Sequence, residues 1–135
     1  MTYTDHYRAE RKQDWTTPRA MFDALHEEYG FTMDGASDET NGLLPKAATV
    51  LAPQFWIGER VFCNPPWSDI RPYVEQAALA DLAVLLVPAR TNARWFHRAL
   101  ELGAKVRFFP GRPRFGDGKW GSPVDCLLLV FSRAV

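Results

Sequence analysis

Four consecutive residues, Asn64-Pro65-Pro66-Trp67, combine groups that could activate an amine attached to a flat ring. The lone pair of such an amine is delocalised into the ring, so the amine is a poor nucleophile until acceptors hold its two hydrogens. The side-chain oxygen of Asn64 is one acceptor, and the backbone carbonyl of Pro65, constrained by the proline that follows, is the other. The indole face of Trp67 could stack on the ring and set its angle. The pattern favours methyl transfer to an exocyclic amine, with Asn64 acting by position and electrostatics because an amide is not a base near neutral pH.

The same four residues also have a purely structural interpretation. Asn-Pro favours turn initiation, proline interrupts a strand ladder, and Trp67 would then be an ordinary core aromatic. The place of the motif favours the functional interpretation, because it directly follows a short apolar run that ends at Cys63.

The strands and helices that must hold this motif follow from the hydrophobic pattern. Residues 60–63 form a predicted strand, and residues 82–88 form an uninterrupted apolar strand typical of the middle of a parallel sheet. Helices are predicted over residues 69–80 and 92–102. Their buried stripes are expected to hold Val74, Ala77, Ala78, Phe96, Ala99 and Leu100.

Helix ends are predicted from capping residues. A helix is expected within residues 16–30, with Thr17 as its cap and Gly30 closing its end. Ser68 or Asp69 is the expected cap of the helix that follows the motif.

Alternation of strands and helices predicts the fold class: an α/β, three-layer, Rossmann-like sheet, mostly parallel, in one minimal domain. This domain is expected to span residues 14–135, after a flexible amino-terminal segment of residues 1–13. A loop without a helix joins the last two strands, which predicts an antiparallel carboxyl-terminal edge strand. The remaining predicted strands are residues 31–34, 48–51, 105–109 and 124–131.

An acidic residue, Asp34, ends one predicted strand of this arrangement, and an amide residue, Asn64, follows another. Ligands of such sheets bind at the carboxyl ends of the strands, so these side chains are expected to share one crevice.

Charge is distributed unevenly along the chain, although the net charge is zero. Residues 1–85 carry 7 Lys and Arg against 13 Asp and Glu, whereas residues 86–135 carry 9 against 3. A basic half could bind nucleic-acid phosphates, or it could be a solvated surface paired with the acidic half. The basic side chains concerned are Arg90, Arg94, Arg98, Arg107, Arg112, Arg114 and Lys119.

Other sequence features exclude several classes of protein. No apolar run is long enough to cross a membrane, and the polar amino terminus lacks the apolar stretch of a signal peptide, which predicts an intracellular protein. Cys63 and Cys126 lie far apart and are expected to be buried free thiols. The Cys and His residues show no metal-ligand spacing, so no metal is expected.

The tetrapeptide resembles the (D/N)PP(Y/F/W) motif of amino-group methyltransferases that use S-adenosylmethionine. More closely, residues 14 to about 131 are similar to the phage DNA N-6-adenine methyltransferase family. Five blocks in one order carry the resemblance: DWTTP (14–18), FTMDGAS (31–37), RVFCNPPW (60–67), LLVPARTNARWFH (85–97) and VRFFPGRPRFG (106–116).

This resemblance implies a class I methyltransferase that binds S-adenosylmethionine, flips adenine out of double-stranded DNA and methylates its exocyclic amine in a bacterial cytoplasm. Its catalytic residues would be Asn64, Pro65, Pro66 and Trp67. Its cofactor-binding residues would be Trp15, Thr17, Pro18, Asp34, Gly35, Ala36 and Ser37. Its DNA-binding residues would be Arg90, Thr91, Arg94, Arg112, Arg114 and Lys119, and Phe115 and Trp120 are weaker candidates for a wall of the adenine pocket.

The sequence departs from the family pattern near the cofactor site. No glycine-rich FxGxG follows the first strand, and no acid follows residues 48–51 to bind the cofactor's ribose, so Asp34, Asp38 or Glu39 would have to supply it. No separate target-recognition domain is expected in this chain, so DNA reading would come from a loop such as residues 110–122, from the amino terminus, or from a second copy in a homodimer.

Two other functions remain open from the sequence. The motif also occurs in enzymes that methylate RNA bases or the glutamine amide of a protein. A degenerate domain that only binds nucleic acid is the alternative from another class.

Overall fold

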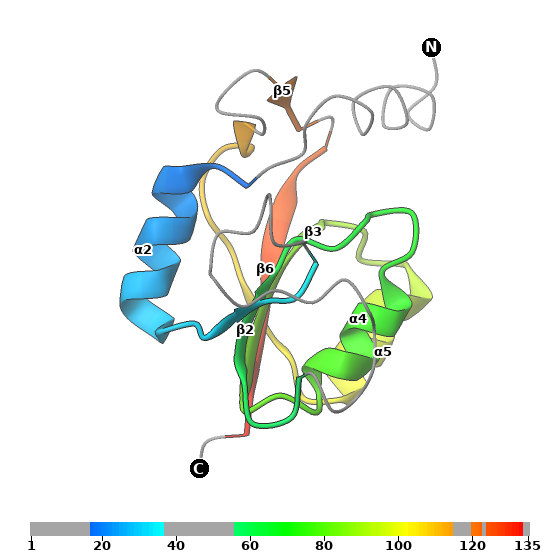
Figure 1. The fold of residues 1–135 in the computed structure, drawn as a ribbon. Helices are drawn as coiled ribbons and strands as arrows, with labels where there is room; N and C mark the ends of the chain where they lie inside the picture. The colour runs from blue at the N-terminus through cyan, green and yellow to red at the C-terminus, as the bar shows by residue number, and fades with distance from the viewer. Residues whose placement is uncertain (1–16, 37–55, 115–119, 123, 134–135) are drawn as a thin grey trace.

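The computed structural model describes residues 17–36, 56–114, 120–122 and 124–133, which contain a five-stranded sheet with helices on both faces (Figure 1). In chain order the elements are α2 (Arg19–Tyr29), β1 (Met33–Asp34), β2 (Arg60–Cys63), α4 (Arg71–Ala77), β3 (Leu82–Pro88), α5 (Arg94–Glu101), β4 (Lys105–Arg107), β5 (Trp120–Gly121) and β6 (Cys126–Ser132). The predicted segment 1–13 and the predicted strand 48–51 lie outside the described residues.

The sheet has the strand order β1-β2-β3-β6-β4. β1, β2 and β3 are parallel, and β6 runs antiparallel to both β3 and β4. The mostly parallel α/β sheet and the antiparallel pairing of its last two strands are therefore confirmed. The prediction that the antiparallel strand forms the edge is wrong, because β6 lies inside the sheet and β4 forms the edge.

Side-chain burial explains this order. Cys126 to Leu129 of β6 are buried in succession, so both faces of this strand are covered, as is typical of a strand inside a sheet. β4 has three residues and begins with the exposed Lys105, and short strands with charged residues suit an edge.

Helices cover the two faces of the sheet in separate layers. In Figure 1, α2 lies on one face, and α4 and α5 lie together on the other. The ring of Phe22 on α2 meets that of Phe62 on β2 with centroids 5.4 Å apart. Val74, Ala77, Phe96 and Ala99 are buried as predicted, whereas Ala78 is half-buried and Leu100 is 42% exposed, so the predicted stripe was too wide.

The helix starts differ from the predicted caps. Pro18, not Thr17, is the N-cap of α2, and Ile70, not Ser68 or Asp69, is the N-cap of α4; neither makes a side-chain capping bond. Pro72 in the first turn of α4 lacks an amide hydrogen, which reduces the need for a cap there. The predicted end of α2 is confirmed, since Gly30 has φ 65° and donates its N–H to the His26 carbonyl at 2.8 Å.

The carboxyl ends of four strands lie at the same end of the sheet, which is called its carboxyl edge below. The carboxyl ends of β1, β2 and β3 lie at this edge because the strands are parallel. β4 points the same way, since it and β3 are both antiparallel to β6. The segment between β4 and β6 therefore begins at the edge where Asp34 and Asn64 lie.

The cysteines are buried and free, as predicted. Among the described residues, no helix is long and apolar enough to cross a bilayer.

Candidate functional site

Asp34 and Asn64 are brought together by the pairing of β1 with β2. In this register Asp34 is opposite Phe62, so Asn64 lies just beyond the end of the strand beside Asp34. The N–H of Gly35 donates to the Phe62 carbonyl at 2.9 Å, which extends the pairing past the end of β1. The two residues lie at the same end of the sheet, as expected, and their sharing of one crevice stays a prediction.

The amide of Asn64 is held by Thr17. Its Nδ2 donates to the Thr17 hydroxyl oxygen at 3.2 Å, across 47 positions of sequence. Thr17 is 5% exposed and lies two residues before α2, and its hydroxyl contacts Asn64 instead of capping the helix. Because the nitrogen and oxygen of an amide lie on opposite branches, this bond turns Oδ1 away from Thr17.

The two prolines that follow are used differently. The carbonyl of Pro66 accepts the N–H of Asp69 at 3.0 Å and closes a turn into α4. Among the described residues, no donor contacts the carbonyl of Pro65, although Pro65 is buried. The carbonyl of Pro65, which the sequence predicts to be the second acceptor for the amine, is therefore not used by this turn.

Trp67 belongs to the hydrophobic core. The residue is 6% exposed and lies among the buried residues that pack beneath the motif. In this conformation it presents little surface to a ligand, so stacking of a base on its indole remains a prediction that requires the ring to be uncovered.

Asp34 is a buried carboxylate, 5% exposed, at the end of β1. Its Oδ1 accepts the N–H of Ala36 at 3.2 Å, so the side chain caps the turn that follows the strand. Burial raises the pKa of the neighbouring Cys63 thiol well above its ordinary value, and the charge of Asp34 raises this pKa further. Cys63 is therefore a neutral thiol at neutral pH.

Packing accounts for the glycine after Asp34. A Cβ on Gly35 would lie 2.5 Å from Cζ2 of Trp56 and 2.9 Å from Cγ1 of Val61. Trp56 is fully buried, and among the described residues its indole Nε1–H has no acceptor. Sequence reasoning did not single out Trp56.

Three predicted site residues, Trp15, Ser37 and Lys119, lie outside the described residues, as does Phe115, and the side chain of Trp120 is not described either. Pro18 follows Thr17, and Gly35 and Ala36 follow Asp34; that these residues hold a cofactor stays a prediction.

Arg90, Thr91 and Arg94 are exposed between β3 and the first turn of α5. β3 continues past the register partner of Cys63 to Pro88 before this segment begins. The three side chains therefore stand at the same edge of the sheet as Asn64, as predicted.

Much of the remaining basic charge is paired. Arg98 binds Glu75 through two nitrogens, at 2.8 and 3.0 Å, and joins α5 to α4. Arg107 binds Glu28 of α2 at 2.8 Å. Hydrogen bonding by Arg98 lowers the pKa of Glu75, and that by Glu28 raises the pKa of Arg107. For these two arginines the structure confirms pairing with the acidic half of the chain.

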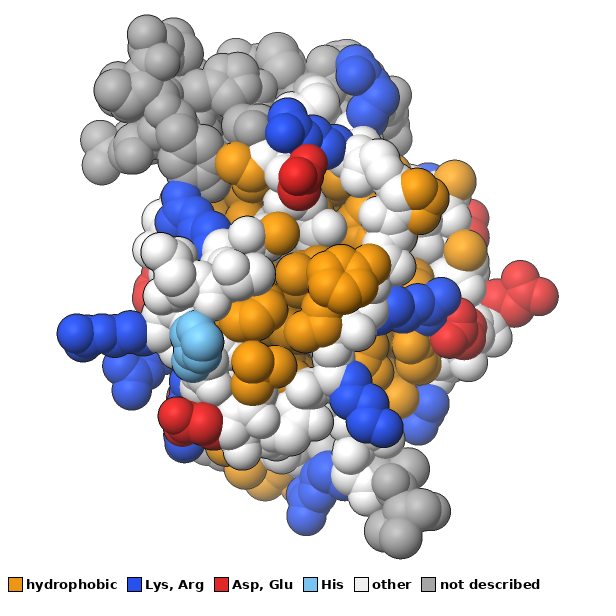
Figure 2. All heavy atoms as spheres, turned by 180° about the vertical axis from the view of Figure 1, so that it is seen from behind, with side chains coloured by type: hydrophobic (Ala, Val, Ile, Leu, Met, Phe, Trp, Pro, Cys, Tyr) orange, Lys and Arg blue, Asp and Glu red, His pale blue; other side chains and the backbone are white. Residues whose placement is uncertain are grey.

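The distribution of charge on the surface agrees with this. On the face shown in Figure 2, Lys and Arg side chains border an apolar centre and do not form one continuous basic surface.

A pocket of about 500 Å³ lies between the start of α2 and the segment after β4. Residues 18–21 form one wall, and residues 109–110 and 112–114 form the other. Arg112, a predicted DNA contact, lines it and also binds Asp125 at 2.8 Å. Arg19, which the sequence did not single out, lines it as well.

The structure defines an α/β domain whose mostly parallel sheet has one inner antiparallel strand and carries Asn-Pro-Pro-Trp directly after an inner parallel strand. Residues 4–132 match the family described as DNA N-6-adenine-methyltransferase (Dam), and the chain belongs to this family. The predicted family is thus confirmed over most of the chain.

Among solved structures, the chain is similar to a candidate RNA methyltransferase from Pyrococcus horikoshii, with 19% sequence identity and a TM-score of 0.48 over 84% of this chain. The match spans 58% of the length of that protein's chain. None of the curated proteins matches.

Proposed function

We propose that the protein transfers a methyl group from S-adenosylmethionine to the exocyclic amine of adenine in DNA, with the adenine flipped out of the duplex. The observation that carries this proposal is the register of β1 and β2, which places Asn64 two residues beyond the partner of Asp34, at the same end of the sheet, in a chain of the Dam family. We expect the DNA to belong to a bacterial host or a phage.

Asn64 and Pro65 would hold the amine. Oδ1 of Asn64 and the carbonyl of Pro65 would each accept one N–H of the amine, which draws its lone pair out of the ring and favours a tetrahedral nitrogen. Thr17 supports this role because it binds Nδ2 of Asn64 and so leaves Oδ1 to face the amine. If the amide were flipped, its NH2 group would face the hydrogens of the amine and could not accept them. Neither group is a base near neutral pH, so the proton leaves the nitrogen after transfer.

The residues at the end of β1 fit the cofactor. When bound, S-adenosylmethionine supplies an electrophilic methyl group on a positively charged sulfur, next to an ammonium group. The buried Asp34 offers a carboxylate of opposite charge beside the strand that carries Asn64. We propose that Asp34, Gly35, Ala36 and Ser37 hold this group with Trp15, Thr17 and Pro18.

DNA binding would offset the cost of extracting the base. Unstacking and unpairing a nucleotide cost a few kcal/mol. Exposed arginines at the same sheet edge, Arg90 and Arg94, could bind the flanking phosphates. Arg112, Arg114 and Lys119 are proposed to bind DNA from the segment after β4.

The proposal is tested by incubating the protein with S-adenosylmethionine labelled in its methyl group and with unmethylated DNA, RNA or protein acceptors. We expect label on N6 of adenine in DNA. Label on RNA or protein alone would overturn the choice of acceptor. Absence of cofactor binding at millimolar concentration by calorimetry would overturn the assignment as an enzyme and leave a nucleic-acid-binding domain.

A further inference from the structure

The pocket between α2 and the segment after β4 combines positive charge with apolar surface. Arg19, Arg112 and Arg114 line it, and none of the described lining residues is acidic. Met21 and Phe109, both half-buried, and the buried Pro113 supply its apolar surface. A ligand that fits should therefore carry negative charge on one part and a flat apolar group on another.

Two of these arginines form ion pairs with exposed acids. Arg19 binds Asp23 at 3.0 Å, with the two side chains 63% and 56% exposed. Arg112 binds Asp125 at 2.8 Å, with exposures of 53% and 78%. Exposed ion pairs of this kind contribute little stability, so each guanidinium can exchange its carboxylate for a phosphate at small cost.

The size and charge of the pocket favour a nucleotide over the cofactor. Ligand pockets of roughly 300–1,000 Å³ bury small molecules of nucleotide size, and this one measures about 500 Å³. S-adenosylmethionine carries a sulfonium and an ammonium against a single carboxylate, so a pocket lined by three arginines, two of them paired with exposed acids outside its lining, favours an anion over it. A DNA phosphate with its base has the opposite charge and a flat apolar face.

The pocket also adjoins the proposed catalytic residues. Pro18, which lines it, follows Thr17, and Thr17 holds the amide of Asn64. We infer that the pocket binds a nucleotide of the DNA strand next to the flipped adenine, with its phosphate on Arg19 and Arg112 and its base against Phe109 and Met21. This inference rests on the proposed function and makes the pocket a determinant of which base may flank the target.

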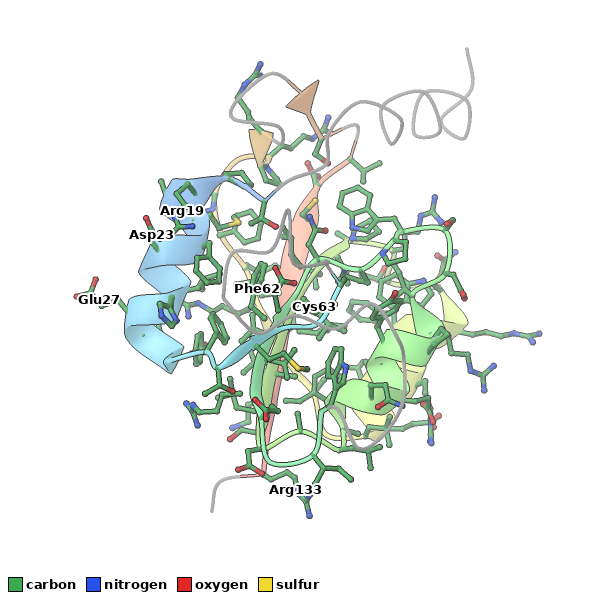
Figure 3. The ribbon with its side chains drawn as sticks, viewed as in Figure 1. Arg19, Asp23, Glu27, Phe62, Cys63 and Arg133 are labelled. Atoms are coloured by element: carbon green, nitrogen blue, oxygen red, sulfur yellow. The ribbon has the colours of Figure 1, made fainter. Side chains whose placement is uncertain are left out.

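The test compares two arginines at opposite ends of the molecule. Figure 3 shows Arg19 at the start of α2 and Arg133 at the far end of the sheet, close to the carboxyl terminus. Arg133 is exposed, and its side chain contacts a backbone carbonyl, that of Leu79, at 3.5 Å. Arg19→Gln and Arg133→Gln therefore remove equal charge, and only the first removes it from the pocket.

Affinity for a fluorescent duplex of 20 base pairs is measured by anisotropy over a range of salt concentrations. Arg19→Gln should weaken binding roughly 5–10-fold and reduce the slope of log K against log salt by about one, as loss of one phosphate contact does. Asp23→Asn should strengthen binding about twofold to fivefold, because it removes the carboxylate that competes for Arg19. Arg133→Gln should leave affinity within about twofold of the wild type, as charge loss away from the bound phosphates does.

Equal losses for Arg19→Gln and Arg133→Gln would overturn the inference. So would a loss of cofactor affinity in Arg19→Gln as large as its loss of DNA affinity, since the pocket would then serve the cofactor. If the wild type methylates DNA in either case, the proposed function stands and the pocket assignment alone fails.

A second variant tests the role in base preference. Phe109→Ala removes the aromatic part of the pocket and should relax the preference at the nucleotide beside the methylated adenine, as read by sequencing methylated positions. An unchanged flanking preference at equal turnover would contradict contact between the pocket and a base.

Discussion

The end of β2 and the arginine-lined pocket lie at the same edge of the sheet but are built in opposite ways. Around Asn64 the polar groups are few and mostly buried, and the amide is bound by a buried hydroxyl. Around the pocket the polar groups are exposed cations whose carboxylate partners are also exposed. The difference fits two tasks, since orienting an amine needs a fixed acceptor, whereas binding a phosphate needs partners that can be exchanged.

The largest effect should come from the fixed region. Asn64→Ala removes one acceptor of the amine and should lower kcat about 10³-fold, the scale on which single oriented hydrogen-bonding groups contribute to catalysis. Methyl transfer to DNA measures kcat, and circular dichroism checks that the variant is folded. Near-normal turnover by a folded Asn64→Ala would exclude the role proposed for this residue.

Thr17 should have a smaller effect of the same kind. Thr17→Val replaces the hydroxyl by a methyl group of similar size and leaves Nδ2 of Asn64 without this acceptor. We expect kcat to fall about 10–100-fold through misplacement of the amide, a larger factor than the loss of cofactor affinity, to which Thr17 is also proposed to contribute. Thr17→Ser keeps the hydroxyl and should recover most of the rate.

Thr17→Val and Thr17→Ser together show whether the hydroxyl of Thr17 acts on the amide of Asn64. If Thr17→Ser is as slow as Thr17→Val, the hydroxyl is not what matters. If the affinity for S-adenosylmethionine falls as much as kcat does, the proposed contact of Thr17 with the cofactor outweighs its bond to Asn64.

Packing beneath the fixed region should be sensitive to one added methyl group. Gly35→Ala places a Cβ in space that the indole of Trp56 occupies and should lower the free energy of unfolding by about 1–3 kcal/mol, a typical cost of overpacking. Denaturant titration measures the loss. Gly35→Ala combined with Trp56→Phe should lose less than the sum of the two single variants, and strict additivity would show that the two residues do not compete for space.

The smallest effect expected is on the dependence of stability on pH. Burial is the main cause that raises the pKa of Cys126 from 9.0 to about 11. Because the folded state binds this proton more tightly than the unfolded state, the contribution is present below about pH 9 and is lost as the pH rises toward 11. At pH 10 we expect a loss of about 1 kcal/mol from this thiol.

Cys126→Ala serves as the control for this effect. Its free energy of unfolding should fall less steeply between pH 9 and pH 10 than that of the wild type. Identical slopes for the two proteins would show that the thiol does not titrate differently in the folded state.

Local sequence patterns predicted the bounds of an element well where a single residue type determines the backbone conformation or the burial. β3 has the predicted bounds because an uninterrupted apolar run can be satisfied only inside a sheet. The end of α2 at Gly30 follows from the positive φ that glycine adopts at low cost. The predicted cap of α2 failed because the hydroxyl of Thr17 has a partner in another part of the chain.

The sequence by itself determined that an amide and two prolines follow a buried strand, and that the chain belongs with enzymes bearing this motif, since adjacent residues and short periodicities carry that information. Only the tertiary structure decided that β6 lies inside the sheet, that Thr17 binds Asn64, and that Arg19 and Arg112 line one pocket. Each of these joins segments distant in the chain, and such contacts are selected by the burial and hydrogen bonding of the whole fold rather than by any local pattern.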